Sequence, residues 1–167
     1  NEAIEWFDKA ETKAEEDLKI EIQSYRKKIA SIFLDSIQNY KNQMTIEEAE
    51  KLARDALELF PEHKRGNQIL AGIYLDKGIL NTDIGNYSEA IQNYLHAIEL
   101  YPPIEIIVLE KFNQLIKAFM KDAYFAAKAG ELHLVIKSLK SIIELNPELA
   151  NKLDSYIIKL ETKMKNL

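Results

Sequence analysis

The sequence predicts an all-α fold, and three observations carry the prediction. Residues that favour helices, namely Leu, Ile, Ala, Glu and Lys, dominate the chain of 167 residues. Only 5 Gly and 4 Pro interrupt them, so long elements are expected. Apolar residues recur at intervals of three and four over most of the chain, which is the period of a helix with one buried face. We therefore expect seven or eight helices and no sheet.

The first two expected elements follow one another without a clear break. A short helical pattern covers 1–15, and a longer one covers 17–41. Neither Gly nor Pro separates the two patterns, so no local signal requires a turn between them. Two structures stay open here: two helices joined by a turn, or one helix from about 2 to 41.

Three short helices are each expected to end at a proline. The phrases LELFP, IELYP and IELNP close at Pro61, Pro102 and Pro147, which are 41 and 45 residues apart. Proline ends a helix because it lacks an N–H group and restricts the residue before it. The start signals are Thr45, as an N-cap, and Gly85 with Asn86, as a turn and cap. One stripe marks the inner face of these helices: Ala49, Ala53 and Ala56 in one, and Ala90 and Ala97 with Tyr94 between them in the next.

Longer helices are expected before each of the last two short ones, over 63–84 and 103–129. The first of them contains Gly66, Gly72 and Gly78. Each costs about 1 kcal/mol relative to Ala inside a helix. We expect one helix to about Thr82, in which the glycines allow a neighbour to approach closely or produce a local kink. The alternative is a helix that ends at Gly78 and is followed by an insertion.

The second of the short helices resembles the second helix of a tetratricopeptide repeat, on six residues: Gly85, Tyr87, Ala90, Tyr94, Ala97 and Pro102. The resemblance implies a right-handed superhelix of antiparallel helix pairs. A repeat of this family has about 34 residues, so the longer spacing here implies extended first helices. The expected units are a partial one at 1–15, then 17–61, 63–102 and 103–147, with a polar-backed capping helix at 148–166. That last helix should cover the end of the array with Leu153, Tyr156, Ile157 and Leu160.

The resemblance also implies a function, which is non-catalytic protein–protein interaction. First helices of this family line a concave face that holds a peptide or helix of a partner. Counting along those helices gives these expected partner-binding residues: Leu34, Gln38 and Lys41, then Leu75, Ile79 and Thr82, then Lys117, Met120 and Tyr124. Their apolar members either form an exposed band or pack against the extended neighbouring helices. The alternative function is an oligomerisation or regulatory module of a larger protein, with a second copy as the partner.

Composition argues against several other classes of function. The net charge of −5 and the presence of only three Arg argue against a nucleic-acid surface. The three His residues show no metal-ligand spacing and there is no Cys, so we expect no metal site, no cofactor and no enzyme activity. No apolar run is long enough to span a membrane. The basic cluster at 26–28 is interpreted as solvated surface charge.

The chain begins at Asn1, inside a helical pattern, so we expect it to be a fragment of a longer protein. The absence of Cys favours a reducing compartment such as the cytoplasm, although it is also common in bacterial envelope proteins.

Overall fold

The computed structural model describes residues 2–13, 16–39, 43–128, 133, 136–137, 139–140, 143, 147 and 150–165. Within these ranges the regular structure consists of α-helical and 3-10 segments, and no strand occurs. The all-α prediction is therefore confirmed. The chain forms two compact units, Asn1–Ile73 and Tyr74–Leu167, and each is described by itself.

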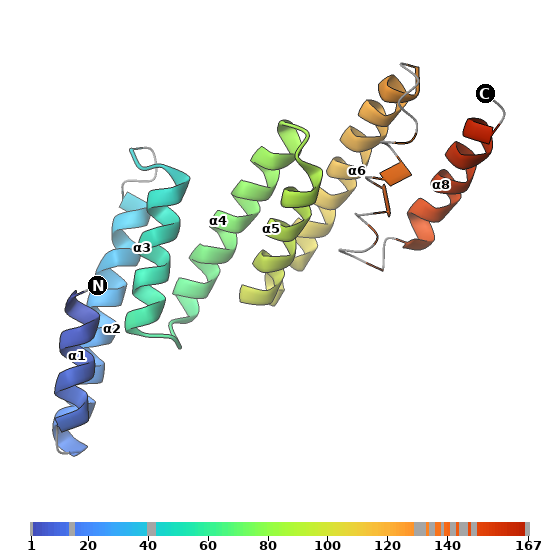
Figure 1. The fold of residues 1–167 in the computed structure, drawn as a ribbon. Helices are drawn as coiled ribbons and strands as arrows, with labels where there is room; N and C mark the ends of the chain where they lie inside the picture. Colours follow the sequence, from blue (N-terminus) through green and yellow to red (C-terminus); the bar gives the residue numbers. More distant parts are fainter. Residues whose placement is uncertain are drawn as a thin grey trace. The chain divides into compact units, whose positions relative to one another are not determined.

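The first unit contains α1 (Glu2–Lys13), α2 (Glu16–Asn39), α3 (Ile46–Leu59) and the first half of α4 (Lys64–Asp83). Helices α1 and α2 are two separate helices, so the alternative of one continuous helix is wrong. Residue 8 meets residue 26 and residue 11 meets residue 23, which is the order of an antiparallel pair. Figure 1 shows α1 against the first part of α2, and α3 beside the remainder of α2.

Helix α2 packs mainly on α1 and α3. Its buried residues are Ile22, Arg26, Ala30, Leu34 and Ile37. Helix α3 begins as the sequence predicted. The Thr45 hydroxyl accepts a hydrogen bond from the Glu48 N–H at 3.2 Å, and the Glu48 carboxylate accepts one from the Thr45 N–H at 2.8 Å. This reciprocal capping box satisfies two backbone donors at the helix start. The hydrogen bonds that the Glu48 carboxylate accepts from the N–H and the hydroxyl of Thr45 hold the pKa of Glu48 below its usual value.

The two closing turns at Phe60 and Tyr101 have nearly the same backbone conformation. Phe60 has φ −143° and ψ 86°, and Tyr101 has φ −147° and ψ 84°. The Phe60 N–H donates to the carbonyl of Ala56 at 3.0 Å, and the Tyr101 N–H donates to that of Ala97 at 3.1 Å. The spacing of 41 residues in the sequence is therefore repeated in local structure, including the carbonyl acceptors four residues back.

The second unit contains the remainder of α4, then α5 (Tyr87–Leu100), the 3-10 helix η1 (Pro102–Ile104), α6 (Glu105–Lys128) and α8 (Ala150–Lys165). The turn before α5 uses Gly85 at φ +79°, a conformation that favours glycine. Asn86 occupies the N-cap position but its side-chain oxygen accepts no capping hydrogen bond; its side-chain amide donates to Asn81 Oδ1. The side-chain cap predicted for Asn86 is therefore wrong.

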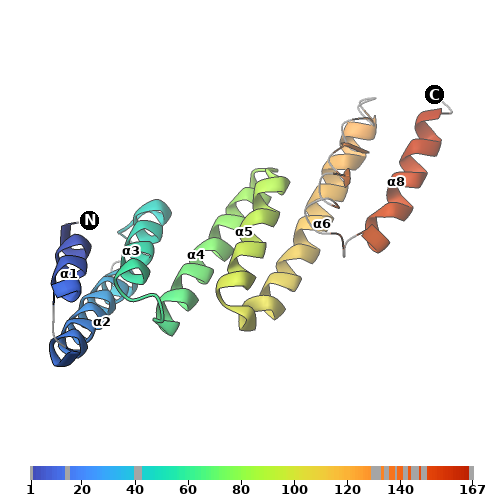
Figure 2. The ribbon, with the colours of Figure 1, turned by 60° about the horizontal axis from the view of Figure 1, so that its bottom comes forward.

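Helix α4 continues through Gly78, as the sequence prediction preferred, and the reason is packing. A Cβ atom at Gly78 would lie 2.4 Å from the Tyr94 ring of α5. Ala90 and Ala97 are fully buried on either side of Tyr94. The ring of Tyr94 in turn contacts that of Phe112 in α6, with centroids 5.3 Å apart. In both views α5 lies beside α6 (Figure 1, Figure 2).

Helix α8 takes part in the core with only part of its predicted face. Leu153 and Ile157 are buried, whereas Leu160 is half-buried and Tyr156 is exposed. The Lys140 ammonium donates to the Glu161 carboxylate at 2.9 Å and so holds the pKa of Glu161 below its usual value. Of the last short helix expected before Pro147, most residues lie outside the described ones, while Leu139 is buried and Pro147 is exposed. The repeat superhelix with a capping helix stays a prediction.

Candidate functional site

The predicted partner-binding residues of α2 do not form an exposed surface. Leu34 is 0 % exposed, because the buried face of α2 reaches it, so its assignment to an exposed band is wrong and the packed alternative holds. Gln38 is exposed, but its carbonyl accepts a hydrogen bond from Arg65 at 2.7 Å. Arg65 also forms an ion pair with Asp35 at 2.7 Å. Lys41 lies outside the described residues.

The other predicted residues belong to the second unit. Leu75 and Ile79 are half-buried on α4, and Thr82 donates to the carbonyl of Gly78. Lys117 is exposed on α6. Met120 and Tyr124 lie within the bounds of α6, but their side chains are outside the described part.

Helix α6 carries an exposed stripe that the sequence prediction only partly included. Ile106, Leu109, Asn113 and Lys117 are all exposed, with Ile106 at 81 % and Leu109 at 53 %. Their spacing of three, four and four places them on one side of the helix. The buried residues Val108, Phe112, Leu115 and Phe119 occupy the opposite side. Leu109 lies eight residues before Lys117, and this spacing places both on the outer stripe.

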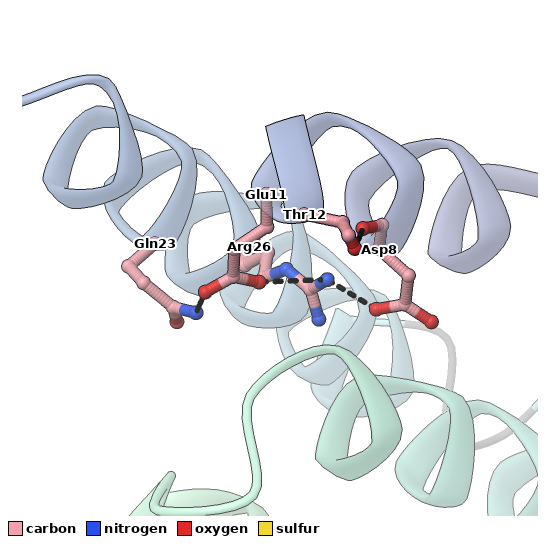
Figure 3. Close-up of polar contacts among 5 residues, drawn as sticks. All are labelled: Asp8, Glu11, Thr12, Gln23 and Arg26. Carbon is pink, nitrogen blue, oxygen red and sulfur yellow. Dashed lines mark hydrogen bonds and ion pairs between the residues drawn. The ribbon is translucent and has the colours of Figure 1, made fainter. Parts of the chain in front are cut away.

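A second candidate is a polar cluster in the first unit, centred on Arg26 (Figure 3). Arg26 is only 7 % exposed, so its interpretation as solvated surface charge is wrong. Its Nη2 atom pairs with Asp8 and lies 3.2 Å from Glu11 Oε2, and its guanidinium lies 5.6 Å from the centre of the Phe7 ring. Glu11 also accepts a hydrogen bond from Gln23 at 2.6 Å.

This cluster joins α1 to α2 through groups that must be taken out of water. A buried guanidinium is tolerated only where carboxylates pair with it. Arg26 Nε is buried and has no hydrogen-bond partner, so one N–H donor of this side chain makes no hydrogen bond. An open depression of about 360 Å³ lies next to the cluster and is lined by Asp8, Glu11, Thr12 and Lys19. This arrangement is best suited to a structural role, which is to hold α1 in place on α2.

A third polar contact ties α5 to α6. The Tyr87 hydroxyl donates to Asp122 Oδ2 at 2.5 Å, and the Tyr87 ring packs edge-on against Phe119. Burial, together with the neighbouring Asp122 carboxylate, raises the pKa of Tyr87 well above its usual value. Because the phenol is neutral and already engaged, it acts as a structural tie at neutral pH.

Comparisons with protein-family models, with curated proteins and with solved structures gave no match to this chain. In the described part of the chain no helix is both long and apolar enough to cross a membrane. Among the same residues, no group of three or more His, Asp or Glu side chains gathers in a way that could hold a metal ion.

Proposed function

We propose that the chain is a non-catalytic scaffold of tetratricopeptide-like repeats that binds a peptide or a helix of another protein. The observation that supports this most is the repeated closing turn, in which Phe60 and Tyr101 share dihedral angles and hydrogen-bond pattern 41 residues apart. Fully buried alanines precede both turns, Ala53 and Ala56 in α3 and Ala90 and Ala97 in α5. Repeated helices of this kind commonly present extended binding surfaces.

The binding surface in this proposal is the outer stripe of α6, defined by Ile106, Leu109, Asn113 and Lys117. Scattered apolar residues are normal on a protein surface. Here two large aliphatic side chains instead lie on successive turns of one helix and are followed by an amide and an ammonium group. Their order fits an amphipathic partner that places apolar side chains on the first half of the stripe and a carboxylate near Lys117. By helical position, Met120 and Tyr124 extend the same stripe.

The experiment compares capture of partners by the wild-type chain with capture by Leu109→Glu. A charge in the centre of the stripe should abolish capture because it would have to be buried unpaired in the complex. The matched control is Ile107→Glu, since Ile107 is also exposed but lies about 100° around the helix from Ile106. Circular dichroism spectra of both variants should match the wild type.

The charge at the end of the stripe provides a second test. Lys117→Glu should weaken capture of an acidic partner and make the remaining binding less sensitive to salt. Equal capture by wild type, Leu109→Glu and Ile107→Glu would refute the stripe as the binding surface. The alternative function, oligomerisation, is favoured by a different observation, which concerns α1.

A further inference from the structure

The contact between α1 and α2 consists of side chains that a second copy of the chain could supply equally well. Ile4 is the buried apolar residue of α1, and the polar part of the contact is Arg26 of α2 with Asp8 and Glu11 of α1. Most of the remaining surface of α1 is in water, including Trp6, which is 74 % exposed. A helix of 12 residues held by so few buried groups is marginal by itself. Its position therefore depends on the ion-paired cluster.

We infer that α1 also docks on α2 of a second copy, so that two chains exchange their α1 helices and form a dimer. In this dimer Arg26 of each protomer pairs with the partner's Asp8 and the partner's Glu11. The inference goes beyond the proposed scaffold function, because it concerns the first unit and a copy of the same chain. Exchange leaves the buried contacts unchanged in kind, which is the reason that domain swapping is a low-cost route to dimers.

The register of the contact makes the exchange symmetric. Residue 8 pairs with residue 26 and residue 11 with residue 23, and both pairs of numbers add up to 34. If the same register forms between two chains as a pair of antiparallel helices, position 17 of one chain lies opposite position 17 of the other. Leu18, which is 50 % exposed in the hairpin, then lies beside the two-fold axis. Exchange would therefore bury an apolar side chain that the single chain leaves in water.

The sequence around the connection is compatible with a continuous helix. Helix α1 ends at Lys13 and α2 begins at Glu16, and the stretch Thr12–Asp17 reads TKAEED, without Gly, Pro or Asn. Between Lys13 and Glu16 the sequence holds only Ala14 and Glu15, two residue types that favour a helix over a turn. A helix that runs on from α1 into α2 would gain backbone hydrogen bonds at little further entropy cost, because propagation is easier than nucleation. Short connections between helices are also a recognised cause of swapping.

The test uses charge reversal so that only the exchanged dimer has matched pairs. The first variant is Asp8→Lys with Glu11→Lys, and the second is Arg26→Glu. Each variant alone places like charges together, within one chain and between identical chains. In a 1:1 mixture, each α1 matches α2 of the other chain. Light scattering after size exclusion should show a heterodimer in the mixture, at a fraction at least ten times that of either variant alone.

The triple variant, which carries all three reversals in one chain, is the matched control and should behave as the wild type does. A mixture of the two charge variants that stays monomeric overturns the proposal. In that case we expect the face of α2 that contacts α1 to bind an acidic helix of a different protein instead. Equal dimerisation of both variants alone also overturns it, because the ion pairs would not set the partner.

A second measurement protects the test against variants that fold poorly. The wild-type chain has no cysteine, so Glu11→Cys and Gln23→Cys introduce single thiols at positions in direct contact. Mixing the two variants under oxidising conditions should produce a disulfide-linked heterodimer on a denaturing gel. Ser24→Cys replaces Gln23→Cys as the control, because Ser24 is exposed and lies about 100° around α2 from Gln23. Equal yields of heterodimer for both pairs, or none for either, contradict docking in this register.

Discussion

Two helix hairpins of this chain are held together by opposite kinds of contact. Where α4 meets α5, a glycine faces an aromatic ring: Gly78 leaves room for Tyr94, and the Tyr94 hydroxyl lies 3.2 Å from the Thr82 hydroxyl. Where α1 meets α2, the buried centre is the guanidinium of Arg26 between two carboxylates. The first contact removes apolar surface from water, whereas the second removes charges.

The two kinds of contact differ in how much they stabilise a hairpin and in how strictly they set its register. Burial of apolar surface is favourable wherever the packing is good. A buried ion pair must first recover the cost of desolvation, so it contributes less to stability while it penalises every register that separates the charges. We therefore expect the α4–α5 hairpin to be the stable one, and the α1–α2 hairpin to be precise in register but easily opened.

The largest effect should come from the aromatic ring at the centre of the α4–α5 contact. Tyr94→Ala removes a fully buried ring that contacts both Gly78 and Phe112. The cavity and the lost burial should cost about 3–5 kcal/mol in urea unfolding. The control is Tyr25→Ala, because Tyr25 is exposed on α2 and its removal should cost no more than about 0.5 kcal/mol. Similar losses for the two variants would show that Tyr94 does not anchor the hairpin.

The glycines of α4 allow the same contact to be tested by adding atoms. Gly78→Ala gains helix propensity but drives a methyl group into the Tyr94 ring, and overpacking costs about 1–3 kcal/mol. Gly72→Ala meets nothing within 4 Å, so it should stabilise the protein by up to about 1 kcal/mol. The two variants should therefore shift the melting temperature in opposite directions. A shift in the same direction for both would mean that α4 and α5 are further apart than described.

The α1–α2 hairpin should respond to loss of charge more than to loss of shape. Asp8→Asn with Glu11→Gln leaves the Arg26 guanidinium buried without counter-charges, at a cost of about 1–3 kcal/mol. Arg26→Met removes the buried charge itself and should cost less. Trp6, the single Trp of the chain, lies on α1, so its fluorescence anisotropy reports whether α1 is docked. Anisotropy should fall for the double variant and stay near the wild-type value for Arg26→Met; the reverse order would assign the contact to packing.

The contrast between the hairpins also explains which features were predictable from the sequence. The bounds of α3 and α5 follow local signals, since Thr45, Gly85, Pro61 and Pro102 each act on the backbone beside them. The break between α1 and α2 has no such signal. The hairpin is held by Arg26 meeting Asp8 and Glu11, and a pairing 15 to 18 residues away is not visible in a local pattern.

The site residues were harder to place, for a related reason. Leu34 was assigned to an outer face by counting along one helix, but α2 packs on α1 near one end and on α3 further along. Its buried residues from Ile22 to Leu34 are spaced by four, which turns the buried face by about 40° at each step. A face that winds in this way cannot be extrapolated from one end of a helix. On α6 the buried face stays in place, and Lys117 is exposed as predicted.

The smallest effect concerns Tyr87, whose contact with Asp122 combines both kinds of interaction. Tyr87→Phe keeps the ring against Phe119 but removes the hydrogen bond, which should cost about 1 kcal/mol at pH 7 because the site is partly solvated.

The raised pKa of Tyr87 predicts how this loss of stability depends on pH. An unfolded tyrosine ionises near pH 10, whereas the folded state retains the proton to higher pH. The contribution of the Tyr87–Asp122 hydrogen bond to the free energy of unfolding is therefore complete below about pH 10 and declines as the pH rises above it. Urea unfolding at pH 7, 9, 10 and 11 should show the gap between wild type and Tyr87→Phe narrowing only at the alkaline end. The control is Tyr25→Phe, which removes the hydroxyl of an exposed tyrosine on α2. A gap for Tyr87→Phe that does not change with pH would mean that Asp122 does not hold the phenol, and that α5 and α6 are joined by ring packing alone.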